Sequence, residues 1–179
     1  MTRLFLIRHA PPLNEGRLAG RRDVPADCGD QAGFATMRAH LPENAARWCS
    51  PALRCRMTAD ALGLDAPDLH DSLWEQDYGA WEGLPFDQLP DLGPLAPADL
   101  ARHRPEGGES FADMAARAVP RLAMASGDTV VVAHAGTVRA GLSMVVGPAA
   151  LSFAIAPLSL TILRKAGSDW AVEAVNLTR

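Results

Sequence analysis

Lysine is nearly absent from this sequence. Lys165 is the only one, so arginine supplies almost all of the positive charge. Arginine suits bidentate contacts with carboxylate and phosphate groups, but a bias spread over a whole sequence indicates little by itself. The net charge is −4 at pH 7, so no overall positive field attracts nucleic acid or an anionic membrane. We therefore expect neither nucleic acid nor a membrane as a partner.

Cysteine and long apolar runs are also scarce. The three cysteines, Cys28, Cys49 and Cys55, are odd in number and irregularly spaced, which argues against a framework of disulfide bonds. No C-x-x-C or H-x-x-E-H spacing indicates a zinc site. No apolar run approaches the roughly 18 residues that a membrane helix needs, and the N-terminus lacks the long apolar region of a signal peptide. These absences favour a reduced, soluble protein of the cytoplasm.

The pattern along the chain is typical of an α/β protein. Hydrophobic residues make up 48% of the 179 residues and charged residues 21%, which fits one globular domain over residues 1–179. Strand-like segments alternate with helical ones, and this predicts a three-layer α/β/α sandwich with a mostly parallel central sheet. Residues 75–108 contain five glycines and five prolines, so we predict a small, loop-rich cap there.

The individual elements follow from apolar patterns and end signals. Strands are expected at 1–8, 47–50 and 129–133, with a terminal hairpin of 158–163 and 170–175. Helices are expected at 31–41, 50–63, from about 109 through Leu122, and 136–146. Ser50 is the predicted N-cap of the second helix, with Pro51 at its first position. Pro120 is expected to kink the third helix.

Three of the predicted strands end in polar or charged side chains. These are Arg8 and His9 after the first strand, Ser50 with Arg54 after the second, and His134 after the third. In open α/β sheets, ligands bind beyond the carboxyl ends of the strands. If the strands are neighbours, two arginines and two histidines converge there, and helix N-termini add free N–H groups. The sequence therefore predicts a site for a small dianion, of which phosphate is the obvious one.

Each of these residues also has an ordinary structural interpretation. A single histidine at a strand end is more often structural than catalytic, and Arg54 alone could be a surface charge of a helix. Pro11 and Pro12 would stop a strand equally well, because neither has an N–H group to donate. The joint pattern favours the functional interpretation.

Five segments resemble the motifs of the histidine phosphatase superfamily, also called the phosphoglycerate mutase-like superfamily, and they occur in its order. They are L-I-R-H (6–9), S-P-A-L-R-C-R-M-T-A (50–59), L-W-E-Q-D-Y-G-A-W-E-G (73–83), P-E-G-G-E-S (105–110) and V-V-A-H-A-G-T-V-R (131–139). The resemblance implies an enzyme that forms a phosphohistidine and needs neither a metal nor a cofactor. Its partner would be a small phosphorylated metabolite, bound by a monomer or a small homo-oligomer.

The resemblance also implies roles for individual residues. His9 would attack phosphorus through a neutral ring nitrogen, and Glu75 would protonate the leaving oxygen and then activate water. The other expected site residues bind the phosphoryl oxygens and stabilise the transition state. They are Arg8, Arg54, His134, Ala135 and Asn14. Glu82 is the nearest rival of Glu75 for the acid role, and Asp77 is a weaker one.

The segment that follows His9 departs from the family pattern. The family usually continues R-H-G-[E/Q]-[T/S], whereas this chain has Ala10-Pro11-Pro12, and the loop from His9 to Gly20 is a residue or two shorter. The offset of Asn14 is also unusual for the family's phosphate-contacting asparagine. The acid phosphatase branch has an aspartate directly after its second histidine; here that residue is Ala135, so that branch is disfavoured.

The motifs leave the substrate open. The Y-G-x-W-E-G and P-x-G-G-E-S segments most resemble those of α-ribazole phosphatases, which act late in cobalamin assembly. Broad-specificity sugar phosphatases share them, and phosphoglycerate mutases of the family are usually longer than 179 residues. A mutase-like phosphotransferase and a non-enzymatic phospholigand-binding module are the remaining alternatives.

Overall fold

A six-stranded mixed sheet forms the centre of the computed structural model, which describes residues 1–178. The strands are β1 (Arg3–Arg8), β2 (Ala46–Cys49), β3 (Asp68–Leu69), β4 (Asp128–Ala133), β5 (Leu160–Ala166) and β6 (Asp169–Leu177). Their order is β3-β2-β4-β1-β5-β6. The first four strands in this order run parallel, whereas β5 and β6 join antiparallel as the predicted terminal hairpin. The polar strand ends therefore lie in the parallel half.

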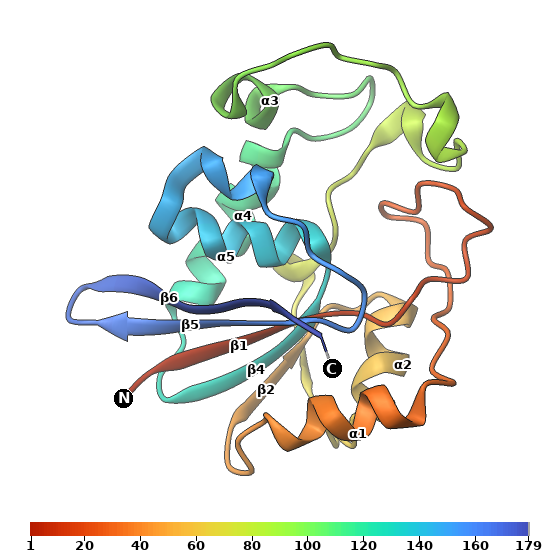
Figure 1. Cartoon of the computed structure of the whole chain (residues 1–179). Helices are drawn as coiled ribbons and strands as arrows, with labels where there is room; N and C mark the ends of the chain where they lie inside the picture. Colours follow the sequence, from red (N-terminus) through yellow and green to blue (C-terminus); the bar gives the residue numbers. More distant parts are fainter. Residues whose placement is uncertain (179) are drawn as a thin grey trace.

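Helices cover both faces of the sheet, as the three-layer prediction requires (Figure 1). One face carries α1 (Gln31–Ala39) and α2 (Leu53–Ala61), and the other carries α4 (Phe111–Ala123) and α5 (Ala135–Val146). Alternate side chains of β1 separate into two cores: Phe5 and Ile7 pack toward α1 and α2, and Leu4 and Leu6 toward α4 and α5. A strand buried on both faces explains the unbroken apolar run at 4–7.

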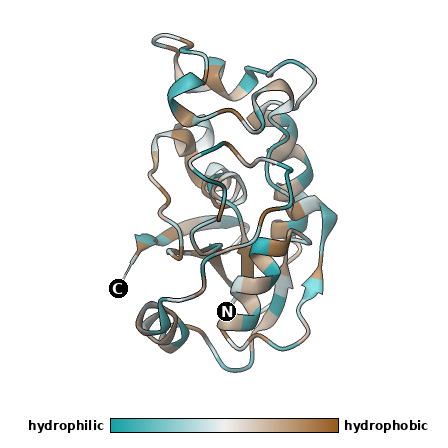
Figure 2. Cartoon of the chain, turned by 90° about the vertical axis from the view of Figure 1, so that its right-hand side faces the viewer, coloured by the Kyte–Doolittle hydropathy of each residue, from teal (hydrophilic) through white to brown (hydrophobic). Residues whose placement is uncertain are grey.

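The cap is as rich in loops as predicted, with three short helices inside it. These are η2 (Gly79–Trp81), η3 (Phe86–Gln88) and α3 (Pro97–Arg102), none of which was predicted. The two views place the cap at one end of the molecule, with hydrophilic and hydrophobic residues mixed along it (Figure 1; Figure 2). Short helices η1 (Asp71–Leu73) and η4 (Gly147–Ser152) lie outside the cap.

The two ends of the cap approach each other closely. Ala80 N donates to Glu106 O (2.9 Å), and Glu109 N donates to Asp77 O (2.8 Å). A Cβ atom on Gly79 would lie only 2.1 Å from the Glu106 carbonyl oxygen, and Gly79 has a φ of +50°. This contact gives a physical reason for a glycine in the Y-G-A-W segment.

The predicted N-cap of the second helix is wrong. α2 begins at Leu53, and its N-cap is Ala52, whose side chain makes no capping bond. Instead, Asp23 from the loop at 10–28 accepts a hydrogen bond from Leu53 N (2.6 Å), so a distant carboxylate satisfies the helix start. Ser50 is left free to contact the site. α4 begins with a capping box between Ser110 and Asp113 and continues through Pro120 to Ala123.

Within residues 1–178, no helix combines the length and the apolar character needed to cross a membrane.

Candidate active site

Three neighbouring parallel strands bring the predicted site residues to one edge of the sheet. β4 lies between β2 and β1, which confirms that the three polar strand ends are adjacent. His9 N donates to Ala133 O (2.9 Å), and Ser50 N donates to Val132 O (3.0 Å). The strands thus end at nearly the same level, and the side chains that follow them share one space.

His9 is held in the tautomer that leaves Nε2 with a lone pair. Its Nδ1 lies 2.7 Å from the Ala10 carbonyl oxygen, which can only accept, so Nδ1 carries the proton. Arg54 Nε donates to His9 Nε2 at 3.3 Å, which also requires a lone pair there. Burial, reinforced by the positive charges of Arg54 and Arg8, lowers the pKa of His9 to about 3. The ring is therefore neutral at physiological pH.

Two guanidinium groups lie near His9, that of buried Arg54 and that of partly buried Arg8. Arg54 donates to the carbonyl oxygens of Arg22 (2.9 Å) and Gly20 (2.7 Å), so the loop at 10–28 fixes its side chain. Arg8 Nη1 donates to Ile155 O (2.5 Å), while its buried Nε has no hydrogen-bond partner among the described residues. Burial lowers the pKa of Arg8, because a buried guanidinium loses hydration. An anion beside Arg8 would supply the missing acceptor.

His134 is fully buried between its neighbours. Its Nε2 is 2.8 Å from Ser50 Oγ, and its ring is 5.3 Å from that of His9, centroid to centroid. The Trp74 indole stacks on its other face at 6.4 Å with an interplanar angle of 10°. Burial, with Arg54 close by, lowers the pKa of His134 well below its usual value. The site thus contains two neutral imidazoles and two cations.

The Glu75 carboxyl group lies at the N-terminus of α5. Its Oε1 accepts from Gln76 N (2.9 Å), and its Oε2 lies 3.4 Å from the Gly136 N–H. Only 9% of the residue is exposed. A Cβ atom on Gly136 would lie 2.2 Å from Glu75 Oε1, so a glycine at this position makes room for the carboxyl group.

A cavity of about 270 Å³ joins most of these residues. Six of the seven predicted site residues line it: Arg8, His9, Asn14, Arg54, Glu75 and Ala135. The seventh, His134, lies against His9 beneath the cavity. The Asn14 side chain donates to the Arg17 carbonyl oxygen.

The two rival carboxylates hold the backbone instead of lining the cavity. Glu82 Oε1 accepts from Arg21 N (2.7 Å) and Tyr78 N (3.1 Å), which ties the loop at 10–28 to the segment that follows Glu75. Asp77 Oδ1 accepts from Gly79 N (2.8 Å). Their positions leave Glu75 as the carboxyl group in the cavity.

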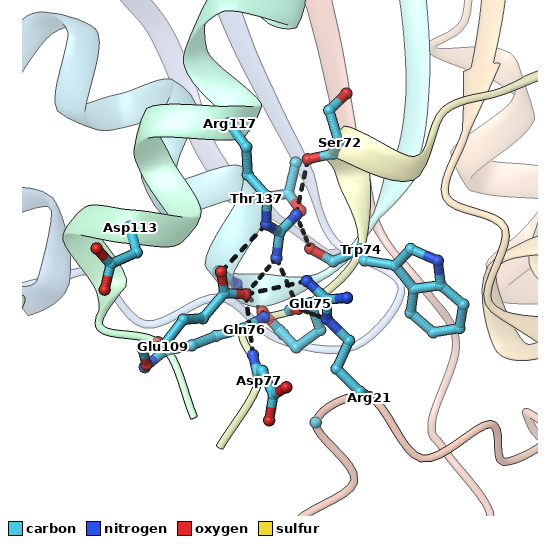
Figure 3. Close-up of polar contacts among 12 residues, drawn as sticks. Arg21, Ser72, Trp74, Glu75, Gln76, Asp77, Glu109, Asp113, Arg117 and Thr137 are labelled. Carbon is cyan, nitrogen blue, oxygen red and sulfur yellow. Dashed lines mark hydrogen bonds and ion pairs between the residues drawn. The ribbon is translucent and has the colours of Figure 1, made fainter. Parts of the chain in front are cut away.

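Sequence reasoning missed several residues in and behind the cavity. Tyr78 and Phe86 line it, and neither was among the seven predicted site residues. Arg21, Glu109 and Arg117 form a polar cluster behind Glu75 (Figure 3). Glu109 lies in the P-E-G-G-E-S segment, but Arg117 stands on a helix with no signal that distinguishes it from a surface arginine.

The fold and the charges around the cavity define an α/β protein whose site suits a phosphate group. The chain belongs to the histidine phosphatase superfamily (branch 1), whose sequence profile matches residues 4–178. Membership confirms the resemblance seen in the motifs.

Solved structures share this fold over nearly the whole chain. TTHB049 from Thermus thermophilus is 28% identical and superposes with a TM-score of 0.78, covering 98% of this chain and 99% of its own. The mycobacterial glucosyl-3-phosphoglycerate phosphatase Rv2419c is 23% identical with a TM-score of 0.83, and each chain is covered completely. A candidate alpha-ribazole-5'-P phosphatase from Escherichia coli is 19% identical with a TM-score of 0.81, covering 98% and 96%. The last two likenesses concern the fold alone.

A curated relative is more similar in sequence but much longer. The bifunctional protein Rv2228c of Mycobacterium tuberculosis is 36% identical over 135 residues, which are 65% of this chain and 35% of that protein. The chain thus matches about a third of the length of this relative.

Substitution of Gly136 by alanine should displace the Glu75 carboxyl group. The new methyl group would overlap Oε1, and a misplacement of about 1 Å can cost on the order of 100-fold in rate. We expect Gly136→Ala to lower kcat by at least about tenfold without unfolding the protein. Gly141→Ala on the same helix is the matched control, because its methyl group would meet Leu6 in the core. Equal turnover per folded molecule in both variants would contradict this placement of Glu75.

The buried histidines should make the protein less stable in mild acid. An unfolded histidine takes up a proton below about pH 6.5, whereas folded His9 stays neutral down to about 3. Between these values the unfolded chain binds more protons, so the free energy of unfolding falls by up to about 1.4 kcal/mol per pH unit for each such histidine. Above pH 7 neither state is protonated, and the effect vanishes.

Urea unfolding of the ligand-free protein at pH 7, 6 and 5, in buffers without phosphate, measures this slope. His9→Asn should remove the contribution of His9 and give a shallower fall of the unfolding free energy. A slope unchanged from wild type would show that His9 is not held neutral by the fold.

Proposed function

We propose that the protein is a phosphomonoester hydrolase that acts through a phosphohistidine on His9. The observation that carries the proposal is the neutral His9 ring, with its Nε2 lone pair directed among two guanidinium groups and a second histidine. A neutral imidazole is nucleophilic, and the adjacent cations attract the phosphate dianion that it attacks.

In the first step, the Arg54 Nε–H leaves His9 Nε2 for a phosphoryl oxygen, which frees the lone pair. His9 Nε2 then forms a bond to phosphorus as the ester P–O bond breaks. The electron pair of that bond goes to the leaving oxygen, which takes a proton from the Glu75 carboxyl group. Arg8 and Arg54 stabilise the charge on the phosphoryl oxygens. Arg8 Nε, which lacks a partner among residues 1–178, gains an acceptor in this arrangement.

In the second step, water cleaves the phosphohistidine. The Glu75 carboxylate, left by the first step, accepts a proton from the attacking water. The new P–O bond forms as the N–P bond breaks, and its electron pair returns to His9 Nε2. Inorganic phosphate leaves, and Glu75 is again protonated. The steps use no metal ion.

We further propose α-ribazole 5′-phosphate, a nucleoside-like phosphomonoester of cobalamin assembly, as the first substrate to test. The motifs at 73–83 and 105–110 support it, and so does the apolar rim of the cavity, where Phe86 is 57% exposed. A flat heterocycle could pack against that ring while its phosphate reaches His9. Sugar phosphates and 3-phosphoglycerate are the competing substrates, the latter for a mutase-like transfer.

Phosphate release by the purified protein tests the reaction and the substrate together. Wild type and His9→Ala are assayed with EDTA on α-ribazole 5′-phosphate, ribose 5-phosphate and 3-phosphoglycerate. We expect release that EDTA does not reduce, that His9→Ala abolishes, and that favours α-ribazole 5′-phosphate. Similar slow release from every ester would withdraw the cobalamin substrate alone. Conversion of 3-phosphoglycerate that needs a bisphosphate primer would favour a mutase, and phosphate binding without turnover would favour a binding module.

Replacement of the Glu75 carboxyl group by an amide should slow both steps. General acid–base catalysis contributes about 10²–10⁴-fold, so Glu75→Gln should lose activity in that range. Glu82→Gln is the matched control because Glu82 bonds backbone N–H groups outside the cavity. A loss below about tenfold in Glu75→Gln would place the acid elsewhere.

A further inference from the structure

We propose that Arg117 is the positioning residue that aims Glu75 at the leaving group. It lies in the middle of α4 and reaches the backbone of the segment that carries Glu75 (Figure 3). The inference rests on the proposed function, because it assigns the means by which the general acid is held in place.

The segment around Glu75 has no regular structure of its own to fix it. η1 ends at Leu73, and Glu75 lies in neither a helix nor a strand. Carbonyl groups in such a partly buried segment need donors from elsewhere. Arg117 supplies three of them: Nη1 donates to Ser72 O and Trp74 O (2.8 Å each), and Nη2 donates to Glu75 O (2.9 Å).

Two further side chains complete the set of donors. Thr137 Oγ1 donates to Leu73 O (3.3 Å), and Arg21 Nε donates to Glu75 O (3.2 Å). Four successive carbonyl oxygens, from Ser72 to Glu75, therefore accept hydrogen bonds from side chains. Arg117 binds three of the four, so its loss would free the backbone on both sides of the acid.

Glu109 fixes the orientation of the Arg117 guanidinium group. Its Oε1 accepts from Nη2 (2.6 Å) and its Oε2 from Nε (3.3 Å), which makes a bidentate pair. The same Oε1 accepts from Asp77 N at 3.0 Å, just after Glu75. The planar fork of arginine suits this arrangement of carbonyl and carboxylate acceptors, whereas a lysine offers a single ammonium group.

Arg121, a second arginine of α4, packs against other parts of the protein and serves as a comparison for Arg117. Arg121 lies one turn further along α4, donates to His70 Nε2 (2.8 Å) and stacks over Trp48 at 3.9 Å. Its contacts anchor the helix to the edge of the sheet, away from the backbone around Glu75. Arg121→Met is therefore a matched control that removes the same type of side chain from the same helix.

Steady-state kinetics on an alkyl phosphate and on 4-nitrophenyl phosphate test the inference. Alkoxides need a proton to leave, whereas 4-nitrophenolate leaves without one, so only the alkyl ester depends on the acid in the first step. We expect Arg117→Met to lower kcat for the alkyl ester by about 10- to 100-fold with little change in KM. With 4-nitrophenyl phosphate, the first turnover should stay fast and later turnovers should slow, because water attack also needs Glu75.

A double-mutant cycle separates positioning from general destabilisation. If Arg117 acts through Glu75, Arg117→Met should change the rate by less than about threefold in a Glu75→Gln background. Arg117→Lys restores the charge but not the fork, and it should recover little activity; it also serves as the second variant if Arg117→Met does not fold. Arg121→Met should keep the wild-type kcat per folded molecule.

The outcomes distinguish this inference from the proposed function. Equal losses from Arg117→Met in both backgrounds, equal slowing of both esters in the first turnover, or full rescue by lysine would overturn the positioning role while the phosphatase remained. No turnover by wild type would overturn the proposed function and the inference with it.

Discussion

The hydrogen bond between His9 Nδ1 and the Ala10 carbonyl oxygen determines what the rest of the site can do. It places the lone pair on Nε2, and burial keeps the ring neutral beside two cations. Thr58 Oγ1 on α2 accepts a hydrogen bond from Ala10 N (2.9 Å), so α2 holds Ala10 in place. Ala10 in turn orients the His9 ring. The family usually has glycine at the position of Ala10. Alanine preserves the contact with His9 because the backbone carbonyl makes it, and not the side chain.

Around that contact, the protein concentrates positive charge in a chain whose net charge is −4. The two arginines donate to backbone carbonyl oxygens in place of carboxylates, which leaves their charge largely uncompensated. Apart from Glu75, the neighbouring carboxylates lie one layer further out, where Glu82 and Glu109 bind backbone N–H groups and other arginines. Glu75 is therefore the acidic side chain that shares the cavity with the two arginines.

The fold and the strand-end residues of the cavity could be predicted because they follow from local patterns, whereas Glu75, Asn14 and Ala135 were expected from the family resemblance alone. Apolar runs that end in Arg8, His9 and His134 indicated both the buried strands and the edge where their ends meet. The Ser50 cap failed because a distant residue, Asp23, competed for the same helix N–H groups. Arg117 could not be predicted for a similar reason. In the Glu75 segment it binds backbone carbonyl groups over forty positions away, and every residue type has such a carbonyl group, so the sequence does not distinguish them.

The close approach of Gly79 to Glu106 has a consequence for how the protein can change. The cap leaves and re-enters the body at one point, and backbone hydrogen bonds pin its two ends together. The stretch between Ala80 and Glu106 can therefore vary in length and side chains at a small entropic cost of loop closure without moving Glu75, which precedes it. Mutation can thus reshape the side of the cavity that Phe86 lines while the residues at the strand ends stay in place.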